Sequence, residues 1–66
     1  MNLPEIADTL YSKGFKVKIA PSHEFIAVSL NRRVDFSEIE AACDYEISSK
    51  IRMSRANDGK SVIVRG

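Results

Sequence analysis

The sequence has few of the residues that usually reveal a chemical function. It contains one cysteine, Cys43, and one histidine, His23. A single thiol cannot form an internal disulfide, and the two residues together do not supply the ligand set of a structural zinc site. The three glycines, Gly14, Gly59 and Gly66, stand far apart, so no glycine-rich loop is present to cradle a phosphate. We therefore expect neither a metal nor another cofactor.

Long apolar runs are also absent. The longest unbroken apolar stretch is Phe25-Ile26-Ala27-Val28, whereas a membrane-spanning helix needs about 20 residues. The N-terminus has no basic segment followed by an apolar one, which is the pattern of a secretory signal. From these absences we expect a cytoplasmic, unprocessed chain without a membrane partner.

What remains is an ordinary globular composition in a short chain. The apolar fraction is 44% and the charged fraction 29%, which predicts a folded domain rather than a disordered segment. The 66 residues are enough for a single domain, residues 1–66. A chain of this size buries only about 60% of its unfolded surface, so the core is marginal unless it is well packed or shared with a partner chain. One form of oligomer is a homodimer that pairs through residues 46–55 or 15–20.

The beginning of the chain predicts a helix over residues 3–13. Asn2 is a suitable cap, and Pro4 falls in the first turn, where its missing N–H leaves no bond unmade. Apolar residues then recur at helical spacing, and Gly14 is suited to the left-handed residue that often ends a helix.

A second helix is predicted over residues 35–45. Asp35 is the expected cap, and Glu38 follows three residues later, as in a capping box. The segments that begin at Asn2 and Asp35 share this order of residue types, and each precedes two predicted strands. The chain therefore reads as two helix–strand–strand halves, and whether they arose by duplication stays open.

Strands are predicted over residues 15–20, 25–30, 46–55 and 60–65. In the first strand, Lys16 and Lys18 alternate with apolar residues, which is typical of a half-buried strand. In the second strand, the sequence does not determine which alternate set of residues faces the core, because either Phe25 or Ile26 could face inward. The last two strands would form a hairpin, since Asn57-Asp58-Gly59 supplies the residues that a tight turn needs.

These elements predict an α+β fold of order αββαββ. The simplest arrangement is a four-stranded antiparallel sheet with two helices on one face. This is the ferredoxin-like βαββαβ topology with its first strand moved to the end, which would place residues 61–65 in the sheet centre. The predicted core consists of Ile6, Leu10, Phe15, Val17, Ile19, Val28, Phe36, Ile39, Cys43, Ile47, Ile51, Val62 and Val64.

The predicted sheet face that points away from the helices is the candidate functional surface. It collects cationic side chains with two apolar ones among them, whereas most acidic residues fall in the predicted helices. The candidate partner-binding residues are Lys16, Lys18, Phe25, Lys50, Arg52, Ile63 and Arg65. One alternative is that these cations are only solvated and prevent aggregation of the sheet edges. A second basic spot, Arg32-Arg33, lies in a predicted loop and is expected to be solvated.

No group in the sequence is placed for catalysis. His23 falls in a turn without a predicted partner, Cys43 falls on the buried stripe of a helix, and Glu38 and Glu40 point in different directions on the same helix. We therefore expect no enzyme but a small interaction protein, a regulator or inhibitor of the kind that phages and mobile elements encode. It would dock its basic sheet face or a sheet edge on a host protein. The phage origin rests on size alone.

The alternative function is nucleic-acid binding through the same cations, which would neutralise phosphates. Open sheets that bind single strands usually offer two or three aromatic rings for base stacking. Phe25 is the only ring predicted on this face, so the sequence favours a protein partner.

Overall fold

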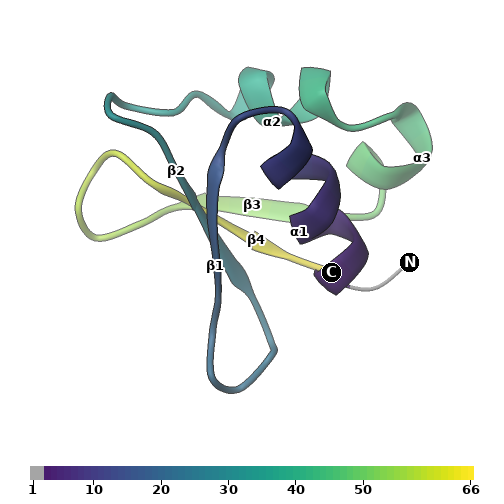
Figure 1. Ribbon diagram of the computed structural model, residues 1–66, viewed down its shortest axis with the longest axis horizontal. Helices are drawn as coiled ribbons and strands as arrows, with labels where there is room; N and C mark the ends of the chain where they lie inside the picture. Colours follow the sequence, from purple (N-terminus) through teal and green to yellow (C-terminus); the bar gives the residue numbers. More distant parts are fainter. Residues whose placement is uncertain (1–2) are drawn as a thin grey trace.

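The computed structural model describes residues 3–66 and contains three helices and four strands (Figure 1). The elements are α1 (Leu3–Ser12), β1 (Lys16–Ile19), β2 (Ile26–Ser29), α2 (Phe36–Ala42), α3 (Tyr45–Ser48), β3 (Arg52–Arg55) and β4 (Val62–Arg65). The predicted cap at Asn2 lies outside the described residues. The first helix occurs where the sequence predicts it, and Gly14, at φ +97°, adopts the left-handed conformation expected after α1. The second begins as predicted but ends at Ala42 instead of residue 45, because Cys43 is extended.

The four strands form one antiparallel sheet in the order β1-β2-β4-β3. The last strand, β4, therefore lies in the centre, as predicted, and β1 and β3 are the edges. This α+β architecture is confirmed and is consistent with a small ferredoxin-like fold. The specific permutation of that topology stays a prediction.

The helices cover one face of the sheet and enclose the core between them and β2 and β4. Figure 1 shows α1 alongside β1, with α2 and α3 following each other along one side of the molecule. Side chains from all three helices share one cluster with the inward residues of the central strands. The fully buried members are Leu10, Ile26, Val28, Val34, Ile39, Val62 and Val64. Burial of Ile26 and Val28 settles the parity of β2, so Phe25 does not face the core.

Most of the predicted core is confirmed, but two of its members are wrong. Val17 and Ile51 are partly buried against the cluster, whereas Ile19 and Phe36 are both 37% exposed. Ile19 ends β1, where the β1–β2 hairpin extends beyond the helices and leaves it uncovered (Figure 1). Phe36 is the first residue of α2 and lies at the margin of the core beside Arg55.

The predicted strand over residues 46–55 is wrong in its first half, because that half forms the short helix α3. Asp44 caps this helix, and its Oδ1 accepts a hydrogen bond of 2.9 Å from the Ile47 N–H. The Ser48 and Ser49 hydroxyls donate to carbonyls three residues back, which favours the helical turn over an extended chain. Cys43 and Asp44 are extended and separate α3 from α2, but Ile39, Cys43 and Ile47 still pack in one apolar cluster.

The β3–β4 hairpin turns at Asn57-Asp58-Gly59, as predicted. Gly59 has φ +74° and donates its N–H to the Ala56 carbonyl at 3.0 Å. The Asp58 carboxylate accepts the N–H groups of Lys60 and Ser61, both at 2.8 Å, and the Ser61 hydroxyl at 2.7 Å. The hydrogen bond from the Ser61 N–H is the largest cause that lowers the pKa of Asp58 from 3.8 to about 2.

Candidate docking face

The side of the sheet that faces away from the helices is the candidate site, and we call it the open face. Strand register places its side chains in rows that cross the sheet. One complete row runs Lys18, Ala27, Ile63 and Ser54 across β1, β2, β4 and β3. On either side of Ile63 the row carries small side chains, so this half-buried isoleucine lies in a depression.

A second row brings Arg65 of β4 opposite Arg52 of β3, and Phe25 lies beside Arg65. The Arg65 guanidinium carbon is 5.1 Å from the centre of the Phe25 ring, which is within the range of a cation–π interaction. The ring is half-buried, and one of its faces is occupied by this guanidinium. Three of the predicted site residues, Phe25, Ile63 and Arg65, are therefore brought together.

These three residues form part of an open hollow of about 310 Å³. It is lined by Phe25, Ser54, Arg55, Ala56, Asn57, Ile63 and Arg65. The hollow extends over β4 towards the β3–β4 hairpin, so its apolar floor is joined to a polar margin. Such a mixture of aromatic, aliphatic and arginine groups is typical of the central part of protein interfaces.

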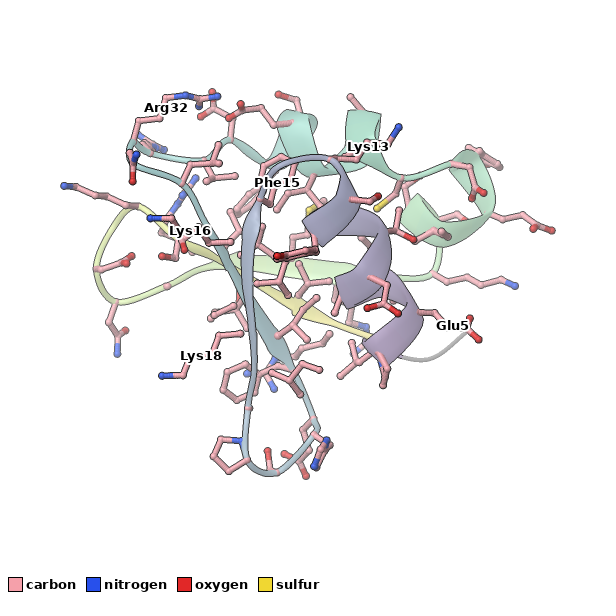
Figure 2. All side chains as sticks on the ribbon, in the orientation of Figure 1. Glu5, Lys13, Phe15, Lys16, Lys18 and Arg32 are labelled. Atoms are coloured by element: carbon pink, nitrogen blue, oxygen red, sulfur yellow. The ribbon has the colours of Figure 1, made fainter. Side chains whose placement is uncertain are left out.

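The lysines of β1 form the outer part of the open face. Figure 2 shows Lys16 and Lys18 extending outward from β1, whereas Phe15 turns towards the helices. Lys16 lies opposite Ser29 and donates a hydrogen bond of 3.1 Å to the Asn31 side chain. Both lysines are exposed, as predicted, and Lys18 begins the row that ends in the hollow.

Lys50 is not part of the open face. A single strand over residues 46–55 would put Lys50 on that face, but in the structure it lies in the turn between α3 and β3. The site is therefore smaller than predicted. Its cations are Lys16, Lys18, Arg52 and Arg65.

Charge is divided between the two layers of the molecule. The strands contain five basic residues, Lys16, Lys18, Arg52, Arg55 and Arg65, and no acidic one. The helices contain Glu5, Asp8, Glu38, Glu40 and Glu46 and no basic one. A chain with a net charge of +1 thus has a cationic sheet and an anionic helical layer.

Arg55 is not among the predicted site residues, and although it lines part of the hollow, its guanidinium lies on the other side of the sheet. Arg55 is two residues after Met53 in β3, so both side chains lie on the helix side of the sheet. The Arg55 guanidinium carbon lies there 5.1 Å from the centre of the Phe36 ring. Its Nη1 donates to the carbonyl oxygens of Val34 at 2.7 Å and Lys60 at 2.9 Å. The alternation in β3 is the signal that assigns Arg55 to this side.

Arg32 is not simply solvated, contrary to expectation, because it pairs with Glu38. Both guanidinium nitrogens Nη1 and Nη2 donate to the carboxylate, which also accepts the Asp35 N–H at 2.8 Å. The hydrogen bonds from Arg32 are the largest cause that lowers the pKa of Glu38 from 4.5 to about 2. This pair connects the loop before α2 to the helix, although the Arg32 side chain is exposed, as is that of Arg33.

The residues with chemical reactivity lie apart from the open face and from one another. Cys43 is buried in the core, and burial raises the pKa of its thiol, so the reactive thiolate is disfavoured. His23 is exposed in the β1–β2 turn. Within residues 3–66, no three histidine, cysteine, aspartate or glutamate side chains gather closely enough to hold a metal ion.

No helix of residues 3–66 combines the length and apolar character that are needed to cross a bilayer. Comparison with known proteins adds no relative, because no family model, no curated protein and no solved structure matches the chain. The class of the protein is therefore defined by its own architecture, a small α+β domain with a cationic open sheet face.

Proposed function

We propose that this chain is a small non-enzymatic interaction protein that docks its open face on an acidic surface of a partner protein and thereby regulates or inhibits that partner. The observation that carries the proposal is the hollow around Ile63 and Phe25 within a face whose strands carry no acidic residue. Protein interfaces commonly have apolar contacts at the centre and polar or charged groups at the margin.

A protein partner accounts for this face better than a nucleic acid does. Phe25 is the one aromatic ring on the described open face, and Arg65 already covers one side of it. A base would have to displace that guanidinium in order to stack on this side of the ring, whereas sheet modules that bind single strands stack bases on two or three rings. A protein side chain requires only the apolar floor that the hollow provides.

The test is affinity capture with the tagged chain from a lysate of its own organism, split into nuclease-treated and untreated portions. Captured proteins are identified by mass spectrometry, purified, and mixed again with the chain. The informative variant is Arg52→Glu/Arg65→Glu, which reverses two charges on the open face. The matched control is Lys13→Glu/Arg33→Glu, which makes the same change in net charge at exposed loop positions outside the sheet.

We expect a defined acidic protein that survives nuclease treatment, binds when purified, and is lost with the open-face variant but not with the loop control. Capture that requires intact nucleic acid would favour the alternative function. Equal loss with both variants would show that net charge, and not the open face, governs binding. Pairing of two copies through the free edges of β1 or β3 stays a separate prediction, which sedimentation at two concentrations tests.

A further inference from the structure

Two arginines stand opposite each other on the open face without a counterion. Arg52 and Arg65 are direct cross-strand partners. Like charges placed directly opposite in a sheet destabilise it. Within residues 3–66 the recorded salt bridge is Arg32–Glu38, on another part of the molecule, and no salt bridge is recorded for Arg52 or Arg65.

The chain contains acidic residues, but they lie on other elements than the strands of the open face. Its helices carry five acidic residues, and two of its loop carboxylates are engaged in specific hydrogen bonds elsewhere, Asp44 at the start of α3 and Asp58 in the last hairpin. The uncompensated arginine pair adjoins the hollow, because Arg65 belongs to both. The arginine pair and the hollow, whose apolar lining residues include Ile63 and Phe25, are thus parts of one surface.

We propose that Arg52, Arg65 and the Ile63–Phe25 hollow form one composite site for an extended acidic peptide segment of the partner. A carboxylate of the segment lies between the two guanidinium groups, and a neighbouring aromatic or large aliphatic side chain lies on Ile63 and Phe25. This inference rests on the proposed function and names the chemistry that the open face recognises.

The geometry favours a carboxylate beside an apolar residue over charge alone. Arginine presents planar N–H pairs that match a carboxylate in two parallel hydrogen bonds, and its stacking on Phe25 limits the orientations of Arg65 before binding. A guanidinium that is already positioned loses less conformational entropy when it binds. The adjoining apolar floor then adds burial of the neighbouring side chain, which supplies affinity that surface ion pairs alone do not.

The test uses the full chain, labelled with ¹⁵N, and three short synthetic peptides with blocked ends. The probe peptide has a central phenylalanine flanked by glutamates. One control peptide replaces the phenylalanine with serine, and the other replaces the glutamates with glutamines. Binding is measured from amide shifts of the labelled chain, so each titration gives both an affinity and a location.

We expect the probe peptide to shift the amides of Arg52, Ile63 and Arg65, and each control peptide to bind at least about tenfold more weakly. Arg52→Gln and Arg65→Gln should each weaken the probe by about tenfold, and Arg65→Lys should weaken it less. Ile63→Ser should cause a similar loss. Ile63→Thr, which keeps the β-branch, provides the same test if the serine variant is unstable. Arg33→Gln, an equal change in charge, should alter the affinity by less than about twofold.

The inference fails if the serine control peptide binds as tightly as the probe, or if Arg33→Gln weakens binding as much as Arg65→Gln. It also fails if a thymidine oligonucleotide shifts the same amides at lower concentration than the probe does. In the first two cases the proposed function can still hold, because capture of the partner and its loss with Arg52→Glu/Arg65→Glu do not depend on the peptides. Conversely, tight probe binding without a captured partner would support the site and contradict the function.

Discussion

The Arg55 guanidinium donates a hydrogen bond of 2.7 Å to the Val34 carbonyl oxygen, although the two residues are 21 positions apart. It also binds the Lys60 carbonyl and stacks on Phe36, so one side chain ties the start of α2 to the β3–β4 hairpin. The Val34 N–H completes this connection with a bond of 2.9 Å to Lys60. The hairpin carries half of the open face, so its attachment to α2 also positions the site.

The first prediction is that Arg55→Ala lowers the free energy of unfolding by about 1.5–3 kcal/mol, since a charged donor to partly buried carbonyls is lost. Arg55→Lys should recover only part of this, because an ammonium cannot reproduce the planar contacts with two carbonyls and a ring. Urea denaturation measures both. Arg33→Ala is the control, and a similar loss in that variant would contradict the role assigned to Arg55.

The second prediction concerns His23, which has φ +61° in the β1–β2 turn. This left-handed conformation is unfavourable for side chains branched at Cβ and easy for glycine. His23→Ile should therefore lower the free energy of unfolding by about 1–2 kcal/mol, whereas His23→Gly should cost nothing or stabilise slightly. Thermal melting of the two variants decides the matter. A glycine variant that melts below the isoleucine variant would show that the turn does not adopt this conformation.

The third prediction is a loss of stability at acid pH that depends on Asp58. Its folded-state pKa of about 2 lies below its ordinary value of 3.8, so the folded chain binds fewer protons in this range. The stabilisation is present above about pH 4 and is lost as the pH falls towards 2. Glu38, lowered from 4.5 to about 2, adds an effect of the same sign.

Denaturation midpoints between pH 5 and pH 2 measure this dependence. Asp58→Asn keeps an oxygen acceptor for the two N–H groups but cannot ionise, so it should flatten the decline. Asp58→Asn/Glu38→Gln should flatten it further. An unchanged slope in both variants would mean that other carboxylates govern acid unfolding.

The sheet and the open face could be predicted from the sequence because strict alternation specifies both faces of a strand. In β1 apolar residues alternate with lysines, and in β4 Val62 and Val64 alternate with Ile63 and Arg65, of which Ile63 is the one apolar member. The structure confirms the side of Lys16, Lys18, Ile63 and Arg65. The parity of β2 could not be chosen, since Phe25 and Ile26 are both apolar. Packing of Ile26 and Val28 beneath the helices decided it.

The errors have equally specific causes. Ile47, Ile51 and Met53 suggest alternation, but Ser49 falls on the same side of the predicted strand and breaks the pattern. Asp44 is also a residue type that commonly caps a helix, and it caps α3. The burial of Val34, which is absent from the predicted core, has a different cause. Val34 is fully buried in a loop because it occupies the position before the Asp35 cap, with Ile39 at the matching place in the helix, the arrangement of a hydrophobic staple.

The fourth prediction separates a protein partner from a nucleic acid by salt dependence. If Lys16, Lys18, Arg52 and Arg65 each neutralised one phosphate of a single strand, the log–log slope of affinity against salt would be about −3. Binding to the purified partner should have a shallower slope and should respond more strongly to Ile63→Ser than to Lys16→Gln/Lys18→Gln. Affinities measured from 50 to 200 mM salt provide the comparison. A steep slope together with indifference to Ile63→Ser would favour the nucleic-acid alternative.

The most direct test of the central claim is an NMR footprint of the purified partner on the ¹⁵N-labelled chain. We predict that amide shifts and line broadening concentrate on Lys18, Arg52, Ile63 and Arg65, with almost none on α1 and α2. Arg52→Glu/Arg65→Glu should abolish the footprint while the rest of the spectrum stays that of the folded chain. A footprint centred on the acidic helices, or one that survives this variant, would contradict docking through the open face.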